Sequence, residues 1–374
     1  MESILIVAGE VSGDSHAAAM VAEFKKLEPA VQFWGIGGDE LKTEGTELLY
    51  HLQDMAFLGV SEVIKHLPFI LQVQREILSE AEKRQPLCAV LIDYPGFNLK
   101  MARRLKKLGI AVVYYISPQL WAWGGWRVKK IRKYVDKMLV LFEFEKKFYE
   151  QYGINAEFVG HPLVDKFKDV LPISFKPFEE ENIVIGLLPG SRKQEIGSLL
   201  PDMITAAEIL YKEGEIQSAE IVKVEHLPHD LYKKEIGNKS DYIKIVQEPL
   251  QQCLPRYDAV LIASGTATLE TGYFGVPMVV VYKVQLLTYW LGRLLIRLKN
   301  IALINIVAGK ELVPELIQNE FTPPKAAALI KQYLSKKGNS EKREQLKLIR
   351  DKLGKGNVSE RAASYLKKFI RSAE

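Results

Sequence analysis

Cysteine is almost absent from the 374-residue sequence, which contains only Cys88 and Cys253. Two cysteines so far apart build no disulfide framework and no cysteine-pair metal site, which fits a reducing compartment. Long apolar runs are also missing, because no stretch reaches about 18 consecutive apolar residues, and we expect no membrane-spanning helix. The amino terminus lacks a basic stretch and a cleavage site, so we expect no signal peptide and a cytoplasmic location.

A strong excess of one charge sign is missing as well. The net charge is +5, and 26% of the residues are charged. This mild balance permits local anionic partners without indicating a nucleic-acid coat. The six histidines are scattered, and His226 and His229 have no partner at metal-ligand spacing, so we expect no metal and no cofactor. The sequence has neither the G-x-x-x-x-G-K-[ST] loop of many ATPases nor the G-x-S-x-G elbow of serine hydrolases.

Short apolar runs alternate with helical patterns, which favours parallel sheets covered by helices on both faces. The first set of expected strands is 3–7, 31–34, 87–92, 111–115, 138–141 and 157–159, and the second is 183–188, 221–224, 243–246, 259–262 and 278–281. A charged stretch with two prolines at 171–181 separates them. We expect an α/β protein with doubly wound domains at 1–172 and 173–340, followed by helices at 341–374.

The motif LIDYPGFN at residues 91–98 places one carboxylate at the end of an apolar strand, directly before a proline and a glycine. One interpretation is that Asp93 caps a turn. The other is that the carboxyl edge of a parallel strand holds Asp93 where it accepts a proton, as a general base does. The local pattern leaves both interpretations open.

Glycines and small polar residues follow the first strand, in GEVSGDSH at residues 9–16. Exposed N–H groups there suit an anion or sugar hydroxyls, with Ser12 and Asp14 as candidate contacts. An ordinary turn into a helix, capped by Asp14 or Ser15, explains the pattern equally. The spacing differs from the dinucleotide fingerprint G-x-G-x-x-G.

The second set contains two similar turns. In LLPGSRKQEI, Arg192 stands with a glycine and a serine between a strand and a helix, where these groups suit phosphate oxygens. A structural ion pair is the alternative for Arg192. In SGTATLE, the backbone and hydroxyls of Ser264, Gly265 and Thr266 suit a pyrophosphate, and Glu270 could accept hydrogen bonds from a ribose. Helix capping by Ser264 and a dipole effect of Glu270 are the alternatives. Together the turns indicate a nucleotide-diphosphate site.

Two segments combine apolar or aromatic residues with positive charge. Residues 282–300 have leucines at helical spacing, four basic residues and no acid, which is typical of a helix in a lipid interface. A core helix with a basic edge is the alternative. Residues 121–126 hold three tryptophans, and five basic residues follow up to Lys133. An acidic headgroup, a sugar phosphate or a nucleic acid would suit this block.

Eight blocks in a fixed order give the chain a resemblance to a known family. They are VAGEVSGD (7–14), GVSEV (59–63), LIDYPGFN (91–98), YYISPQLWAW (114–123), FVGHPLVD (158–165), LLPGSR (187–192), SGTATLE (264–270) and NIVAGKELVPELIQ (305–318). Over nearly its whole length the sequence resembles the lipid-A-disaccharide synthases, which are glycosyltransferases of lipid A biosynthesis.

The resemblance implies two Rossmann-like domains facing a cleft, a GT-B arrangement, with the C-terminal helices packing back on the first domain. It implies transfer from UDP-2,3-diacylglucosamine to 2,3-diacylglucosamine 1-phosphate through an inverting β-1,6 linkage, with release of UDP. By motif, Asp93 is the expected general base, and Arg192, Glu270 and Asn305 belong to the UDP-sugar site. We expect peripheral attachment to the inner face of the cytoplasmic membrane, no nucleic-acid partner, and a homodimer if the C-terminal helices exchange between two chains.

Two positions depart from the family pattern. Gly96 stands where the family usually has a second acid, and the block usually written Leu-Pro-Asn reads Leu303-Ile304-Asn305. Three alternative functions remain. The first is another GT-B UDP-sugar enzyme, either an epimerase or a transferase with an unacylated acceptor. The second is a nucleotide-sugar binding protein without turnover, and the third is a nucleic-acid binder with a steep salt dependence.

Overall fold

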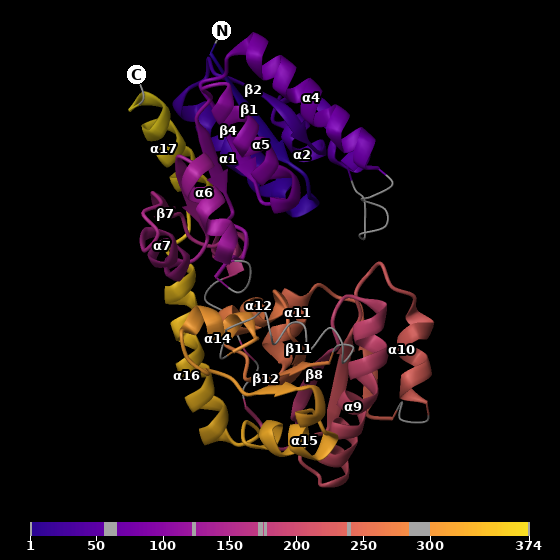
Figure 1. Ribbon diagram of the computed structural model, residues 1–374. Coiled ribbons are helices and arrows are strands. Elements are labelled where there is room, and N and C mark those ends of the chain that lie inside the picture. The colour runs from indigo at the N-terminus through magenta and orange to yellow at the C-terminus, as the bar shows by residue number, and fades with distance from the viewer. Residues whose placement is uncertain are drawn as a thin grey trace. The chain divides into compact units, whose positions relative to one another are not determined.

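The computed structural model describes residues 2–55, 66–121, 125–170, 175, 178–237, 241–283 and 300–372. Contacts between Cα atoms divide the chain into two units (Figure 1). The first unit comprises Met1–Lys166 and Leu353–Glu374, and the second comprises Phe167–Lys352. The first boundary therefore lies after residue 166, where 172 was expected. The second lies after residue 352, where 340 was expected, because most of the helix at 336–353 belongs to the second unit.

The first unit is built on a seven-stranded sheet in the order β3-β2-β1-β4-β5-β6-β7, and its paired strands run parallel. Its strands are β1 (Ser3–Ala8), β2 (Gln32–Gly37), β3 (Glu47–His51), β4 (Cys88–Ile92), β5 (Val112–Tyr115), β6 (Lys137–Val140) and β7 (Ala156–Phe158). Its α-helices are α1 (Val11–Leu27), α2 (Asp39–Thr43), α4 (Leu67–Arg84), α5 (Pro95–Lys107), α6 (Val128–Tyr134), α7 (Glu143–Glu150), α8 (Leu163–Lys166) and α17 (Val358–Arg371). Its 3-10 helices are η1 (Leu52–Met55) and η2 (Gly125–Arg127).

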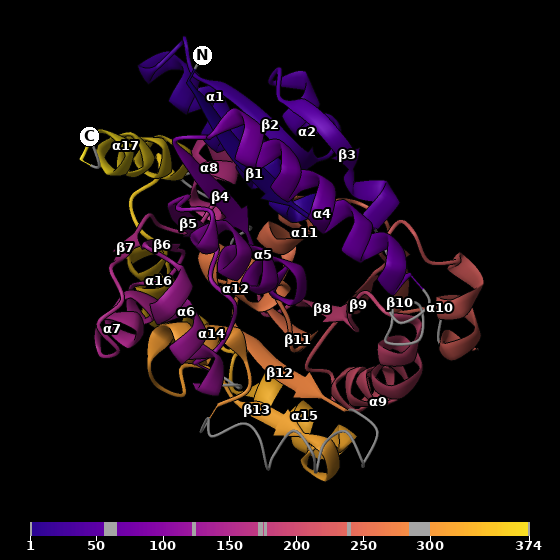
Figure 2. The ribbon, with the colours of Figure 1, turned by 45° about the horizontal axis from the view of Figure 1, so that its top comes forward.

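Helices cover both faces of this sheet (Figure 2). Leu5 and Val7 of β1 share a buried cluster with apolar residues of α4, α5 and α6. Ile4 and Ile6 point to the opposite face because side chains alternate along a strand, and they are fully buried as well. On that face α17 packs against α1, so the end of the chain returns to the first unit, as expected from the resemblance.

The second unit has a six-stranded sheet in the order β10-β9-β8-β11-β12-β13, and its paired strands are also parallel. Its strands are β8 (Val184–Leu188), β9 (Ser218–Val222), β10 (Ile243–Val246), β11 (Ala259–Ala263), β12 (Met278–Tyr282) and β13 (Glu315–Ile317). Its α-helices are α9 (Lys193–Lys212), α10 (His229–Ile236), α11 (Leu250–Cys253), α12 (Ala267–Phe274), α14 (Leu303–Ala308), α15 (Pro323–Lys331) and α16 (Lys336–Leu353). Its 3-10 helices are η3 (Lys168–Val170), η4 (Leu254–Arg256) and η5 (Gln318–Glu320).

The expectation of two doubly wound parallel sheets is confirmed. In each sheet the strand order reverses at one point, between β1 and β4 in the first unit and between β8 and β11 in the second. Open α/β sheets bind ligands at such switch points, outside the carboxyl ends of the strands. Among the described residues, no helix has both the length and the apolar character needed to cross a membrane.

Candidate active site

Asp93 lies at the carboxyl end of β4, at the switch point of the first sheet. Asp93 and Tyr94 both have left-handed backbone, with φ of 44° and 45°, and Ile116 after β5 has φ of 65°. This conformation costs a non-glycine residue about 1–3 kcal/mol, and it is concentrated at functional sites. Three of the six such residues in the described chain thus lie at one edge of one sheet. The strain marks this edge as a candidate site.

Buried side chains hold the strained turn in place. The Tyr114 hydroxyl donates a hydrogen bond of 2.6 Å to the Asp93 carbonyl oxygen. The side-chain nitrogen of Asn98 donates to the same oxygen at 2.9 Å. The Tyr94 ring covers Gly9, where an added Cβ would overlap the ring, so the turn after β1 requires glycine. These contacts fix the backbone from which the Asp93 carboxylate projects.

The pKa of the Asp93 carboxyl is raised to about 6, mainly by burial and next by the negative charge of Glu10, against a hydrogen bond from the Tyr94 backbone. Glu10 lies at the amino end of α1, across the switch point from Asp93. A carboxylate with a pKa near 6 is ionised at neutral pH and takes up a proton more readily than an exposed aspartate. This electrostatic environment favours the general-base interpretation over a simple turn cap.

Ser12 and Asp14 lie in the first turn of α1, which begins earlier than the sequence pattern indicated. Ser12 is exposed, whereas Asp14 is buried. The Asp14 carboxylate accepts hydrogen bonds from the backbone N–H groups of Gly38, at 2.6 Å, and Glu40, at 3.1 Å. It therefore ties α1 to the start of α2, and the alternative that Asp14 or Ser15 caps α1 is wrong, because Glu10 occupies that position.

Glu145 was not singled out from the sequence, although it organises the loop after β5. The residue is 3% exposed, and its carboxylate accepts hydrogen bonds from the Ser117 hydroxyl, at 2.7 Å, and the Trp121 indole, at 3.0 Å. It also accepts from the backbone N–H groups of Leu141 and Phe142. Burial raises the pKa of Glu145 to about 7. One buried carboxylate thus joins the loop after β5 to the turn before α7.

His161, which the sequence left open as a turn residue or a functional one, has a local structural contact. Its Nδ1 accepts a hydrogen bond of 3.2 Å from the Leu163 N–H at the start of α8. Burial, and next the charge of His16, lower its pKa to about 4. The ring is therefore neutral at physiological pH and shapes the turn into α8.

In the second unit, a pocket of about 620 Å³ opens at the carboxyl ends of β8, β9, β10 and β11. Arg192, Ser264, Gly265 and Thr266 all line it, so the structure brings four of the predicted contacts together. Lys223, which the sequence analysis did not identify, lines the same pocket and is 6% exposed. A second pocket, of about 810 Å³, adjoins the first along residues that include Arg192 and Ser264.

Arg192 is the residue before α9, and its side chain is 81% exposed. The guanidinium lies 3.1 Å from the Glu195 carboxylate in the first turn of the same helix. The structural ion pair considered from the sequence is therefore present, yet most of the Arg192 side chain remains exposed and lines both pockets. Both interpretations of Arg192 remain compatible with this geometry.

Glu270 and Asn305 lie outside the residues that line these two pockets. Glu270 is half-buried in the first turn of α12. Asn305 is fully buried in α14, where its Oδ1 accepts hydrogen bonds from the N–H groups of Leu312 and Val313. Its Nδ2 donates to the Val313 carbonyl and the Glu315 carboxylate. In this arrangement the Asn305 amide holds two segments together, and its direct contact with a ligand stays a prediction.

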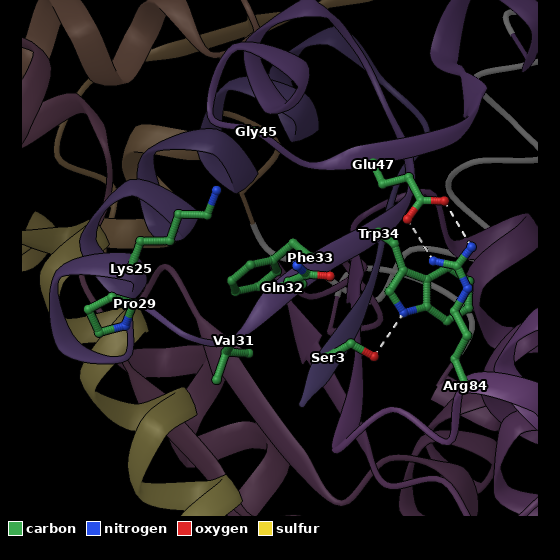
Figure 3. Close-up of a pocket in the computed structure, with 10 residues that line it drawn as sticks. All are labelled: Ser3, Lys25, Pro29, Val31, Gln32, Phe33, Trp34, Gly45, Glu47 and Arg84. Atoms are coloured by element: carbon green, nitrogen blue, oxygen red, sulfur yellow. Dashed lines mark hydrogen bonds and ion pairs between the residues drawn. The ribbon is translucent and has the colours of Figure 1, made fainter. Parts of the chain in front are cut away.

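A third pocket, of about 770 Å³, lies at the amino ends of β1, β2 and β3, opposite the Asp93 edge of the first sheet. Figure 3 shows the Arg84 guanidinium facing the Glu47 carboxylate, with which it forms hydrogen bonds of 2.7 and 2.8 Å. It also lies over the Trp34 ring, 4.8 Å from the centroid. Glu47 thus neutralises Arg84, whereas Lys25, which lines the same pocket, donates a hydrogen bond from Nζ to the Glu44 carbonyl oxygen.

Some sequence predictions cannot be placed. Of the amphipathic segment at 282–300, residues 284–299 lie outside the described part of the chain, as do the block at 59–63 and residues 122–124 of the tryptophan segment. Within the described residues, no group of three histidine, cysteine or acidic side chains is arranged to hold a metal ion.

A family model described as lipid-A-disaccharide synthetase matches residues 4–369. The lipid-A-disaccharide synthase of Nitrosococcus oceani is 42% identical over 369 residues, which cover 94% of this chain and 92% of that protein. The lipid-A-disaccharide synthase of Syntrophus aciditrophicus is 40% identical over 381 residues, which cover 99% and 98%.

Solved structures of low sequence identity share the fold. A UDP-N-acetylglucosamine 2-epimerase structure from Listeria monocytogenes, described as putative, has a TM-score of 0.66 at 14% identity and covers 100% of this chain and 97% of that one. MurG from Acinetobacter baumannii has a TM-score of 0.62 at 14% identity, with 98% and 100% covered. At this identity the likeness shows the fold alone, and it places the two sheets among GT-B proteins.

Proposed function

The chain belongs to the lipid-A-disaccharide synthase family of glycosyltransferases, and we propose that it joins UDP-2,3-diacylglucosamine to 2,3-diacylglucosamine 1-phosphate. The products are a β-1,6-linked disaccharide 1-phosphate and UDP. The observation that carries the proposal at the level of residues is the Asp93 turn. It combines strained backbone, a pKa raised to about 6 and a position at the switch point of the first sheet.

Asp93 acts as the general base in this proposal. A sugar hydroxyl is a poor nucleophile, and it gains reactivity when a carboxylate accepts its proton as the new bond forms. The 6-hydroxyl oxygen of the acceptor attacks the anomeric carbon of the donor, the bond to the diphosphate oxygen breaks, and the proton passes to Asp93. Because this is a single displacement, an α-linked donor gives a β-linked product.

The second unit binds the UDP portion of the donor. Arg192 and the amino ends of α9 and α12 line one pocket, and these groups stabilise negative charge as it develops on the departing diphosphate. Ser264, Gly265 and Thr266 supply hydroxyl and backbone groups at the start of α12. Lys223 adds a buried ammonium group to the same pocket. Glu270 and Asn305 support this region from outside the pocket lining.

We further propose that the protein attaches peripherally to the inner face of the cytoplasmic membrane, where its acylated substrates reside. Leu67 and Leu71, one turn apart at the start of α4, are 40% and 37% exposed, so two large apolar side chains are accessible on one helix face. Exposed lysines and arginines on α5 and α6 suit anionic headgroups or the acceptor phosphate. Pelleting with vesicles that contain acidic lipid tests this, and Leu67→Ser with Leu71→Ser should weaken it.

A homodimer through the C-terminal helices also remains a proposal. In the single chain, α17 packs on α1 after a short connection that contains Gly354 and Gly356, both with positive φ. The same contacts would form if two chains exchanged α17. Light scattering on the purified protein distinguishes a monomer from an exchanged dimer.

UDP release in detergent tests the proposed reaction. With both acylated substrates we expect UDP and a disaccharide whose anomeric proton shows β configuration by NMR. Release that is equally fast with an unacylated acceptor would identify a different GT-B transferase. Conversion of the donor without any acceptor would identify an epimerase or a hydrolase. Binding of UDP without turnover of any substrate would leave a nucleotide-sugar binding protein.

A further inference from the structure

The turn before α9 is closed around a carboxylate of the protein itself. Glu195 Oε2 accepts hydrogen bonds from the backbone N–H groups of Ser191, at 3.0 Å, and Arg192, at 3.2 Å. Glu195 Oε1 accepts from the Arg192 guanidinium at 3.1 Å. Gly190 has φ of 103°, and a Cβ added there would overlap the Glu195 carboxylate. The turn is therefore shaped to hold an anion, and Glu195 supplies one.

The same donors are those that a phosphate group would use at this helix end. Backbone N–H groups at a helix amino terminus and a guanidinium are standard partners of phosphate oxygens. Glu195 lines both adjoining pockets, together with Arg192 and Ser264. Its side chain is 24% exposed, so its negative charge faces any ligand that enters.

Asp14 in the first unit is a second carboxylate in the first turn of a helix, with which Glu195 can be compared. It also sits in the first turn of a helix and also accepts backbone hydrogen bonds from a glycine-rich turn. However, Asp14 is only 4% exposed, and its partners come from a different element. Glu195 differs on both counts, because it is open to the pocket and holds the arginine proposed to bind the diphosphate.

We propose that Glu195 is an internal competitor of the diphosphate, and this inference rests on the proposed UDP site. Without ligand, Glu195 occupies Arg192 and the N–H groups of the turn. When a diphosphate binds, it must share or displace these contacts beside a like charge. Glu195 therefore keeps UDP affinity low and regains its partners as the product leaves. A helix-capping role alone would stabilise α9 without affecting UDP affinity.

The substitution Glu195→Gln separates these roles. Glutamine is accepted at this capping position, so α9 should keep its structure, and a thermal unfolding midpoint close to that of the wild type verifies this. Removing the charge should tighten UDP binding about threefold to tenfold by calorimetry at low salt, with a smaller gain at high salt. Uridine, which lacks the diphosphate, should bind both proteins equally. Unchanged or weaker UDP binding in the folded variant overturns the proposal, as does an equal gain for uridine.

Glu225→Gln is the matched control, because Glu225 is an exposed carboxylate that lines the same pocket. We expect a gain of about twofold or less, since its side chain is not held by the α9 turn. A gain equal to that of Glu195→Gln would reduce the effect to general electrostatics and overturn the proposal. Arg192→Ala tests the UDP site itself. If Arg192→Ala leaves UDP affinity unchanged, the proposed UDP site is wrong. If Arg192→Ala weakens UDP binding while Glu195→Gln does not tighten it, the UDP site stands and only the competitor proposal is wrong.

Discussion

The two sheets reverse their strand order at equivalent points, yet the turns at these points carry opposite chemistry. In the first unit, Glu10 and Asp93 follow β1 and β4, so two carboxylates meet at the switch point. In the second unit, Arg192 and Ser264 follow the corresponding strands β8 and β11. The shared topology provides a place for a ligand, and the residues on the turns decide which chemistry occurs there.

The two switch points also differ in backbone strain. The first switch point contains two consecutive left-handed residues that are not glycine, Asp93 and Tyr94. Two buried side chains donate hydrogen bonds to the Asp93 carbonyl oxygen and support this turn. At the second, the positive φ falls on Gly190, where it costs little. The strained turn is the one that carries Asp93, the proposed general base. Where backbone N–H groups bind an anion, glycine achieves the geometry without strain.

Asp93→Asn tests the proposed difference between the two switch points most directly, and it should have the largest effect on turnover. Asparagine tolerates left-handed backbone, so the turn should persist while the base is lost. We expect turnover to fall about 10²–10⁴-fold, which is the usual contribution of a general base. UDP affinity measured by calorimetry should stay unchanged, because the proposed nucleotide contacts belong to the second unit. A variant that turns over at the normal rate would show that Asp93 only caps the turn and is not the base.

Arg192→Ala tests the proposed diphosphate contact at the switch point of the second unit. Losing charge-assisted hydrogen bonds to the diphosphate should weaken UDP binding about tenfold or more. The pH at which activity falls on the acidic side should not move, because in the proposed mechanism this fall reflects protonation of Asp93. Arg192→Lys should give an intermediate affinity, since it keeps the charge and loses the planar fork. Lys193→Ala is the control, because Lys193 is exposed and adjacent yet lies outside both pocket linings. An effect of similar size there would contradict a specific role for Arg192.

The fold could be predicted from sequence where strands are buried on both sides. Runs such as 88–92 and 259–263 are apolar throughout and fully buried. The two strands that the sequence analysis missed, β3 and β13, lie at sheet edges and read Glu-Leu-Leu-Tyr-His and Glu-Leu-Ile. Edge strands are only half covered, so they lack the continuous apolar signal of central strands.

The candidate site was predictable where a turn follows a strand directly. Asp93 and Arg192 could be placed from their motifs because parallel strands bring such turns to one edge. Lys223 and Glu145 could not, because what makes them notable is burial beside a pocket or a loop, which depends on distant elements. For Asn305 the motif predicted a ligand contact. It could not reveal that both the oxygen and the nitrogen of the amide form hydrogen bonds within the protein.

Tyr114→Phe tests whether the strained turn needs its support. It removes the hydroxyl that donates to the Asp93 carbonyl, while Asn98 still donates to that oxygen. We expect unfolding to become easier by about 1 kcal/mol and turnover to fall a fewfold, with UDP affinity unchanged. Tyr115→Phe is the matched control, because Tyr115 is equally buried in the same strand and points to the opposite face. Equal losses of turnover in both variants would show that the effect is general destabilisation.

Glu10→Gln should have the smallest effect, and it tests why the first switch point carries two carboxylates. The charge of Glu10 contributes to the raised pKa of Asp93, with burial as the larger cause. Removing it lowers the pKa of Asp93, so the ionised base persists to lower pH and the acidic limb of kcat/KM moves down. Because Glu10 is exposed and therefore screened, the shift should be less than about one pH unit and smaller at high salt.

The direction of that shift decides between two roles for Glu10. If it only tunes Asp93, kcat at neutral pH should change little, because Asp93 is ionised there in both proteins. A large loss of kcat at neutral pH with no movement of the acidic limb would instead place Glu10 in contact with the acceptor. Glu143→Gln on α7 controls for charge removal elsewhere in the unit, since Glu143 is exposed and lies outside the Asp93 turn. The acidic limb of that variant should coincide with the wild type, so that any shift in Glu10→Gln reflects the pairing of two carboxylates at one switch point.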